Sequence, residues 1–410
     1  MSKSSQTTHA TPTLGQKEFV ALMALMTSLV ALSIDAMLPA LDQIGEAMHA
    51  ASANDAHLIV SIFFAGMALG QLCFGPYCDS RGRREAILLG LCIFAIGTLV
   101  CMVADDMNTM LAGRLIQAFG VSGPRIAALA IIRDLYVGDA MARVMSFIMM
   151  VFILVPMLAP MIGQAVLIMF SWQHIFTLFL LVSLLTGIWF FSRQPETLPV
   201  SRRQPFSPGQ FLRSSGYILT HGSVMGYTLG MGFNFGAFLA YLSASQTIFQ
   251  GFYGAGEWFP YIFATLAFSI GLASYFNGKM VMRFGMSKLC DVASIGCIGF
   301  AVVFNLLLLA YDGLPPLLVT VPVMFVGFFF IGILFGNLNA MAMQPLGSMA
   351  GLGAAIIGSL SSLFAVPISL LIDHFLDDNL YPIGLGFLVF FALTWISVRY
   401  AEHAKQREAQ

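Results

Sequence analysis

The chain has 410 residues, of which 58% are hydrophobic and only 10% are charged, and its net charge at pH 7 is -1. A soluble domain carries roughly 25% charged residues, so this composition excludes an ordinary soluble enzyme and indicates a protein that meets lipid over most of its surface. No basic stretch with interleaved aromatic residues is present, so nucleic acid is not an expected partner. The six cysteines form no CxxC pair, which argues against a metal site or a disulfide framework.

Apolar stretches recur along the chain at the length of about 20 residues that a helix needs to cross the hydrocarbon core of a bilayer. The first six are expected near 19–41, 57–77, 86–104, 109–132, 142–168 and 173–193. The second six are expected near 217–246, 257–280, 288–311, 316–341, 350–374 and 382–400. The sequence therefore predicts an all-α polytopic membrane protein with twelve transmembrane helices.

The basic residues lie on one side of this pattern. Of the 19 Lys and Arg, only Arg114 and Arg125 lie deep inside an expected span, and the others lie in the tails or in, or at the edges of, connections that follow an even-numbered span. The opposite connections carry Asp and Glu without Lys or Arg. Because connections rich in Lys and Arg remain in the cytoplasm, both termini are expected there.

A polar segment divides the chain into two groups of six spans. Residues 194–214 hold four prolines and three arginines and form the longest polar segment between spans. We therefore expect a cytoplasmic tail, an N-terminal six-helix bundle, a central cytoplasmic linker, a C-terminal six-helix bundle and a second cytoplasmic tail, at 1–16, 17–193, 194–214, 215–400 and 401–410.

The two groups of spans share glycines at matching positions, which predicts two pseudo-symmetric halves. Gly75 and Gly82 bracket the loop after the second span, and Gly278 and Gly285 bracket the loop after the eighth span at the same separation. Transporters built from such repeats bind their substrate near the midplane, between the halves.

Several short motifs resemble those of one family. The loop Gly75–Arg84 (GPYCDSRGRR) is similar to the signature loop of the major facilitator superfamily, and Arg114 with Gln117 and Gly120 is similar to its fourth-span motif. Residues 159–163 (APMIG) resemble the fifth-span motif of its drug:proton antiporters. Narrower matches, at 32–40 (LSIDAMLPA), 133–136 (RDLY) and 195–198 (PETL), resemble the Bcr/CflA type of bicyclomycin and chloramphenicol resistance proteins.

The resemblance implies a twelve-helix antiporter of the bacterial inner membrane that exports small-molecule drugs by alternating access and confers antibiotic resistance. The proton motive force would drive export, so the coupling ion is a proton and no other cofactor is expected. We also expect a monomer surrounded by lipid. An exporter or proton symporter of a physiological metabolite, such as an amino acid, a peptide or a sugar-like solute, remains the alternative. No HExxH motif or intramembrane Ser-Lys or Asp-Asp pair is present, so an intramembrane enzyme is not expected.

Asp35 and Arg114 are the candidate residues for proton coupling. A lone carboxylate inside a membrane span must bind a proton or find a cation, which is the chemistry of a proton-driven exporter. Both residues are expected at similar depth, where they could pair directly or through Gln117. The alternatives are that Asp35 reaches water at its helix end and that Arg114 caps helix ends within one half.

Arg125 departs from the family pattern. It lies three helical turns from Arg114 and on roughly the same face, so it could present a cation to an anionic or carbonyl-rich substrate. The alternatives are that its side chain extends to the cytoplasm or binds carbonyls freed by Pro124.

The expected substrate site combines charged, polar and aromatic side chains. Its walls are expected from an aromatic run in the seventh span, with amides from the seventh and tenth spans, because drug pockets are apolar with few polar groups. The candidates are Asp35, Gln117, Arg125, Phe233, Asn234, Phe235, Phe238, Tyr241, Asn337 and Asn339.

Two further groups are candidates for conformational control. The loop residues Gly75, Asp79, Arg81, Gly82, Arg83 and Arg84 form an expected cytoplasmic gate, and the simpler alternative is that they only set the topology. The antiporter motif comprises Pro156, Ala159, Pro160 and Gly163, which would act as a hinge or serve close packing. Asp373 and His374, at the outer end of the eleventh span, are expected to be a solvated pair; the alternative is that they help to close the outer side or titrate.

Overall fold

The computed structural model describes residues 14–50, 53–136, 138–203 and 207–408, so most of the expected tail 1–16 lies outside the described residues. In the described part, every long element is a helix. The first half contains α1 (Gln16–Asp35), the 3₁₀ turn η1 (Leu38–Ala40), α2 (Leu41–Ala47), α3 (Ala53–Arg81), α4 (Arg83–Met102), α5 (Met107–Leu135), α6 (Gly138–Met169) and α7 (Gln173–Arg193).

The second half repeats this arrangement after the connection that contains η2 (Val200–Arg202) and α8. Its elements are α8 (Pro208–Thr220), α9 (Gly222–Gln246), the π-helical turn η3 (Thr247–Phe252), η4 (Gly256–Trp258), α10 (Phe259–Phe284), α11 (Met286–Ala310), α12 (Leu317–Met343), η5 (Gln344–Met349), α13 (Ala350–His374) and α14 (Tyr381–Glu408). Each of the twelve expected spans corresponds to one long helix within the described residues, so the predicted all-α fold is confirmed.

Ten of the described helices are long and apolar enough to cross a membrane, and α6 contains a shorter apolar stretch, Leu154–Met169. The helix α9 is not among the ten because it carries many glycine and polar residues. It packs against α3, α12, α13 and α14. A helix enclosed by other helices needs less apolar surface than one that faces lipid, which explains its composition.

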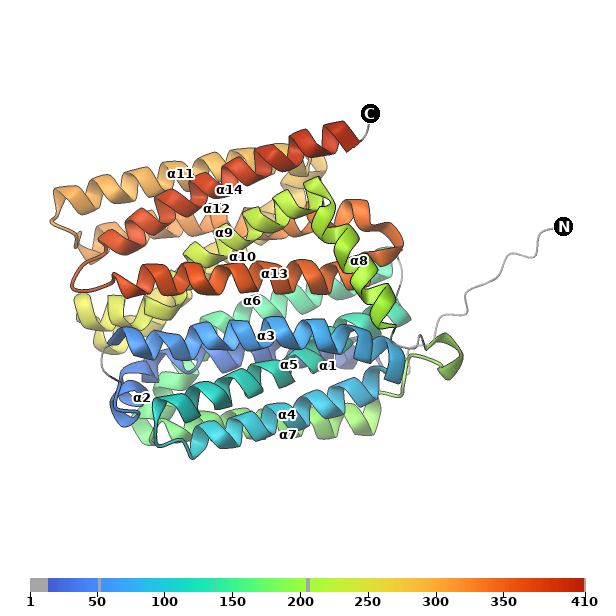
Figure 1. The fold of residues 1–410 in the computed structure, drawn as a ribbon. Coiled ribbons are helices and arrows are strands. Elements are labelled where there is room, and N and C mark those ends of the chain that lie inside the picture. The colour runs from blue at the N-terminus through green and yellow to red at the C-terminus, as the bar shows by residue number, and fades with distance from the viewer. Residues whose placement is uncertain (1–13, 51–52, 137, 204–206, 409–410) are drawn as a thin grey trace.

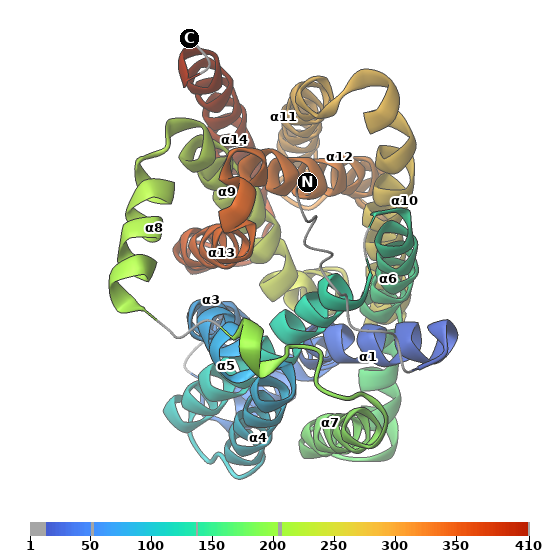
Figure 2. The same cartoon turned by 90° about the vertical axis from the view of Figure 1, so that its right-hand side faces the viewer.

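The helices form two bundles that lie side by side, with α3 against α13 and α6 against α10 at the contacts between them (Figures 1 and 2). The tightest helix pair is α4 with α5, where glycines remove the side chains that would separate the backbones. A Cβ atom added to Gly97 would collide with the backbone nitrogen of Gln117. Close approach through small residues is the usual means of packing helices in membranes.

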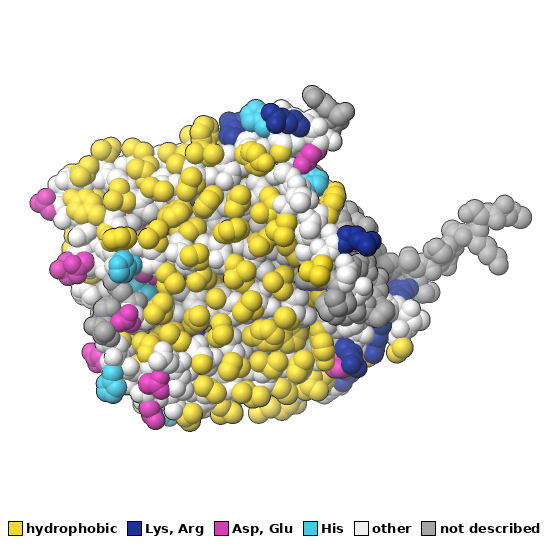
Figure 3. Space-filling view, viewed as in Figure 1, with side chains coloured by type: hydrophobic (Ala, Val, Ile, Leu, Met, Phe, Trp, Pro, Cys, Tyr) yellow, Lys and Arg dark blue, Asp and Glu magenta, His cyan; other side chains and the backbone are white. Residues whose placement is uncertain are grey.

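Charge divides the molecule into two ends. Figure 3 shows Lys and Arg near the end where both termini lie, Asp and Glu at the opposite end, and apolar side chains over the surface between them. We call these the basic end and the acidic end. The uncharged band between them is the part of the surface that suits the interior of a bilayer.

The structure differs from the predicted seventh span at its start. That span was expected to begin near residue 217, but α8 continues to Thr220, the chain breaks at His221, and α9 begins at Gly222. The helix α8 lies on the outer side of the second bundle, near the basic end (Figures 1 and 2). Its residues Leu212, Tyr217 and Leu219 are exposed. An amphipathic helix in this position suits the membrane surface rather than its core.

Candidate functional site: a buried charge system on α1, α5 and α9

Asp35 is the last residue of α1, and only 5% of its surface is exposed. Among the residues that the structure describes, no group forms a hydrogen bond or ion pair with its carboxyl. Its charge lies within electrostatic range of the buried Tyr241 hydroxyl on α9, which itself has no hydrogen-bond partner in the described part of the chain. Burial without a partner strongly disfavours the ionised carboxylate, so the site is suited to holding a proton.

Arg114 on α5 is fully buried and connects three helices. Its Nη1 donates to the carbonyl of Ser33 on α1 at 3.1 Å and to Gln117 Oε1 at 2.6 Å, and its Nε donates to the carbonyl of Ile59 on α3 at 3.2 Å. The guanidinium also lies 4.3 Å from the centre of the Phe63 ring. It therefore reaches the helical turn of Asp35.

The expected pair between Asp35 and Arg114 does not form among the described contacts, either directly or through Gln117. The amide of Gln117 instead donates to Thr98 Oγ1 on α4 at 2.8 Å. One guanidinium nitrogen, Arg114 Nη2, is buried with no partner in the described structure. The arrangement leaves Asp35 as an isolated acid beside a cation that is already bound to backbone carbonyls.

The residues of the antiporter motif lie on α6, which packs against α1 and α10. Ala159 and Pro160 are buried, and Pro156 is partly buried. A Cβ atom added to Gly163 would collide with the carbonyl oxygen of Ala36, the residue that follows Asp35. The motif thus brings the backbone of α6 into direct contact with the end of α1 at the acid.

The aromatic run of α9 divides between two environments. Phe235 contacts Phe64 on α3 with ring centres 5.1 Å apart and Phe335 on α12 with ring centres 5.8 Å apart. Phe238 and Tyr241 both contact Phe328 on α12, with ring centres at 5.5 and 4.6 Å.

Phe233 points elsewhere, because it stacks on Phe390 of α14. Between these aromatic residues, Asn234 is fully buried, and both its amide oxygen and its amide nitrogen have no partner in the described structure. A buried amide without partners is costly in a finished core, so Asn234 is a candidate for contact with a polar ligand.

The two asparagines of α12 are not equivalent. Asn337 is buried and exchanges hydrogen bonds with Asn277 on α10, at 2.7 and 3.3 Å. Asn339 is exposed. The structure therefore brings Asn337 into a polar pair within the second half and does not join Asn339 to it.

Arg125 lies in the middle of α5 and is partly exposed. Its Nη1 contacts the Met67 sulfur on α3 at 3.2 Å, and no carboxylate in the described part of the chain pairs with it. A charged group that keeps accessible surface deep inside a helix bundle is available to a solute of opposite charge.

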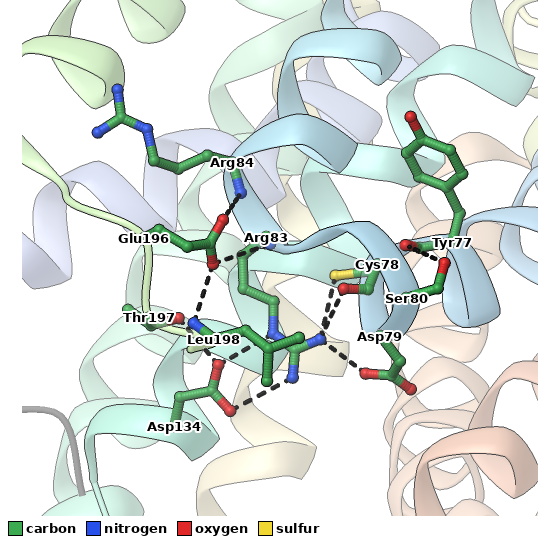
Figure 4. A network of polar contacts seen from close by, with 10 residues as sticks. All are labelled: Tyr77, Cys78, Asp79, Ser80, Arg83, Arg84, Asp134, Glu196, Thr197 and Leu198. Carbon is green, nitrogen blue, oxygen red and sulfur yellow. Dashed lines mark hydrogen bonds and ion pairs between the residues drawn. The ribbon is translucent and has the colours of Figure 1, made fainter. Parts of the chain in front are cut away.

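The predicted gate loop lies at the basic end, where Arg83 organises a polar network (Figure 4). Arg83 Nη1 donates to Asp79 Oδ1 at 2.6 Å and to the Cys78 carbonyl at 2.9 Å. Its Nε donates to Asp134 Oδ2 at 2.9 Å. The buried guanidinium therefore joins the end of α3 to the end of α5, and the Asp79 carboxylate, 59% exposed, pairs within its own half.

Glu196 caps the beginning of α4 from the connection between the halves. Its carboxylate accepts hydrogen bonds from the backbone nitrogens of Arg83 and Arg84, both at 3.0 Å, and from that of Leu198 at 2.9 Å. An anion at a helix N-terminus satisfies the first N–H groups and opposes the positive end of the helix dipole.

The other gate residues surround this network. Arg84 donates to the Gln194 and Phe191 carbonyls at 2.9 and 3.1 Å. Gly82 adopts φ 117° and ψ 165°, a conformation that is almost restricted to glycine. Arg81 is exposed, and Gly75 faces Ala355 of the second half.

The structure brings together four polar residues, Asp134, Glu196, His57 and Asp373, of which the sequence analysis gave a possible role only to Asp373. Asp134 and Glu196 fall in the RDLY and PETL motifs, and their place in these motifs was the signal that the sequence offered. His57 and Asp373 are 1% and 2% exposed and meet across the halves. The expectation of a solvated pair is right for His374, which is exposed, and wrong for Asp373, because His57 of α3 and Ser243 of α9 lie against it.

In the described part of the chain, twelve long helices in two bundles with charged groups buried among them define the class of polytopic membrane transporters rather than a class of enzymes. The sequence matches the family described as Major Facilitator Superfamily over residues 23–369, and the chain belongs to that superfamily.

Two curated bacterial proteins are similar to the chain. A Bacillus subtilis protein called uncharacterized MFS-type transporter YdgK is 30% identical, and the match covers 91% of this chain and 94% of that protein. The bicyclomycin resistance protein homolog of Haemophilus influenzae is also 30% identical, with 83% and 85% covered.

A solved structure has the same fold. The human organic anion transporter MFSD10 superposes with a TM-score of 0.68 at 17% identity, covering 95% of this chain and 100% of that one. At this identity the likeness shows the fold alone. The superfamily predicted from the short motifs is therefore confirmed by the whole-chain comparisons.

Proposed function

We propose that the protein is a proton-coupled antiporter that exports small-molecule drugs by alternating access. The observation that carries this proposal is Asp35, a carboxyl that is buried, has no partner among the described residues and lies next to the contact between Gly163 and Ala36. Such an acid can take a proton from one side of the membrane and release it to the other. The contact with α6 means that any movement of this helix changes the surroundings of the acid.

The relatives support a drug as the cargo, because one of them is named for bicyclomycin resistance. The buried and unsatisfied polar atoms of Asn234 and Tyr241, set among aromatic rings, support a site for a mainly apolar molecule with a few polar groups. We propose that the transporter works as a monomer in lipid and that the proton is its only coupling species.

The distribution of charge supports an orientation in the bacterial inner membrane. The basic end would lie in the cytoplasm with both termini, since connections rich in Lys and Arg are retained there. The acidic end would face the periplasm. The proton motive force would then drive protons from the acidic end toward the basic end.

Arg125 favours a second candidate function, the transport of an anionic metabolite. The residue is partly exposed, and its guanidinium has no carboxylate partner in the described part of the chain. A cation in that position would bind a carboxylate or phosphate solute and disfavour cationic drugs.

The test compares drug susceptibility in a bacterial host that lacks its own pumps. Cells would express the parent protein, Asp35→Asn, or the control Asp105→Asn, which changes an exposed carboxylate in the loop between α4 and α5. At matched membrane expression, we expect resistance from the parent and from Asp105→Asn, and its loss with Asp35→Asn.

Two results would change the proposal. Resistance that survives Asp35→Asn would remove Asp35 from the coupling mechanism. If no compound in the panel is exported, uptake and release of anionic metabolites by proteoliposomes would be measured, with Arg125→Ala as the informative variant.

A further inference from the structure

Polar side chains meet between the two halves close to the acidic end, and they are not the residues of the site around Asp35 and Arg114. We call this group the acidic-end cluster. Its members come from α3, α9, η3 and α13, and they are His57, Ser61, Ser243, Thr247, Ser369 and Asp373. All except Thr247, which is partly buried, are at most 3% exposed.

One side of Asp373 is satisfied by hydroxyl groups. Its Oδ2 accepts hydrogen bonds from Ser243 at 2.8 Å and from Ser369 at 3.2 Å. Its other oxygen, Oδ1, is buried and has no hydrogen-bond partner in the described structure. That oxygen faces Nδ1 of His57 at 3.8 Å.

His57 likewise has a hydrogen-bond partner in the described structure for only one of its two ring nitrogens. Its Nε2 lies 2.9 Å from Thr247 Oγ1 in the second half, whereas its Nδ1 is buried without a hydrogen-bond partner among the described residues. Two incompletely satisfied atoms, one on each half, therefore face each other across a distance slightly longer than a hydrogen bond. A proton bound to either atom converts the pair into a donor that faces an acceptor.

We propose that His57 and Asp373 form a second proton-binding site, shared by the two halves, that keeps the acidic end closed while it holds one proton. With one proton the pair has no net charge. Without it, a carboxylate remains buried beside a neutral imidazole, and with a second proton, an imidazolium remains buried beside a neutral acid. Both charged states are unfavourable in a buried site, and opening to water relieves them.

The pair lies where it can hold the two halves together at the acidic end. Hydrogen bonds also join the halves nearby, between Ser61 and Ser369 at 3.3 Å and from Gln246 on α9 to Asp42 on α2 at 2.6 Å. Opening of the acidic end must separate these contacts, so the charge state of His57 and Asp373 contributes directly to the equilibrium between closed and open forms.

Other ionisable groups on the neighbouring elements are the same in the parent and in the variants of the pair, and any titration of these groups is common to them. These groups are Asp35 on α1, Asp42, Glu46 and His49 on and after α2, Asp55 at the start of α3, Arg114 on α5, Tyr241 on α9 and His374 on α13. The Arg114 guanidinium comes close to the cluster, since it donates to the carbonyl of Ile59. Variants of the pair are therefore compared with the parent at each pH.

The proposal predicts that the fraction of molecules closed at the acidic end is highest at an intermediate pH and falls at both lower and higher pH. Spin labels at Ala47→Cys on α2 and Asp378→Cys in the loop before α14, both exposed, would report the distance between the halves at the acidic end. The exposed Cys73 and Cys92 would be replaced by Ser, while the remaining four cysteines are buried and do not need replacement. Distances would be measured in lipid nanodiscs without substrate, from pH 5 to pH 9.

Each variant should remove one side of this maximum. Asp373→Asn leaves only His57 to titrate, so the opening at high pH should disappear and the opening at low pH should remain. His57→Gln leaves only Asp373 to titrate, so the opening at low pH should disappear and the opening at high pH should remain. The double variant should show no dependence on pH from this site, and the exposed neighbour His374→Gln should behave as the parent does.

A variant with milder packing effects keeps the test decisive if a substitution of the pair impairs folding. Ser243→Ala removes one hydroxyl that donates to the carboxylate form of Asp373, so both sides of the maximum should persist and the high-pH side should move to higher pH. Unchanged profiles in His57→Gln, Asp373→Asn and Ser243→Ala would overturn the proposal. The measurement uses no substrate and no proton gradient, so this result would leave the proposed drug export untouched.

Discussion

The contact between Gly163 and the end of α1 gives a prediction that can be worked out from the structure. Gly163→Ala adds one Cβ atom, and that atom would overlap the carbonyl oxygen of Ala36. The obstacle is backbone, so no side-chain rotation relieves it. The helices α6 and α1 must separate at the turn of α1 that ends in Asp35.

The expected loss of stability follows from two opposing effects. Overpacking of a tight contact costs about 1–3 kcal/mol, while replacing glycine by alanine in a helix favours the helix by up to about 1 kcal/mol. The middle of the overpacking range, about 2 kcal/mol, less a gain of at most about 1 kcal/mol leaves a net destabilisation of about 1–2 kcal/mol, which corresponds to a melting temperature that is lower by a few degrees. The control is Gly299→Ala on α11, where an added Cβ meets nothing within 4 Å.

The assay is thermal unfolding of the two purified variants and the parent in the same detergent, followed by proton-driven transport at matched protein amounts. Gly163→Ala should unfold at lower temperature and transport more slowly, because the surroundings of Asp35 are displaced. Gly299→Ala should equal or exceed the parent in stability. Equal melting temperatures for all three proteins would refute the reasoning, as would a loss of the same size in the control.

Three other substitutions test separate parts of the structure. Arg114→Lys keeps the charge but cannot reproduce the hydrogen bonds of the guanidinium to two helices, so it should lower stability by about 2–4 kcal/mol; thermal unfolding would measure this, and a stable variant would contradict the central position of Arg114. Gly82→Ala combines an unfavourable backbone conformation with a Cβ atom 2.6 Å from Glu196, whereas Gly285→Ala, at φ 77°, meets no neighbour. Both should lose about 1–3 kcal/mol from the backbone, and Gly82→Ala should lose more; equal melting temperatures would exclude a contribution from the Glu196 contact. Arg125→Ala should weaken binding of anionic ligands tenfold or more while leaving neutral ligands nearly unchanged, as measured by titration of the purified protein; an unchanged ligand profile would remove Arg125 from the substrate site.

Some features of the site could be predicted from local sequence because a short motif carries them. Gly82 and Gly285 both adopt backbone conformations that favour glycine, at the start of α4 and of α11, and their equal spacing from Gly75 and Gly278 was visible in the chain. Asp35 and Arg114 could be identified as special because charged residues inside apolar spans are rare. Their partners could not, since a motif does not say which backbone carbonyls an arginine will reach.

The sequence by itself determined the twelve spans, the two halves and the separation of charge between the two ends. The physical reason is that a bilayer imposes its thickness on each helix separately, so a local count of apolar residues is sufficient. Only the tertiary structure decided which buried polar groups meet. Asp373 stands next to a loop and would be solvated on sequence grounds, yet α3 and α9 pack against α13 and place it opposite His57. That contact depends on how two bundles pack, and no local pattern in either segment encodes it.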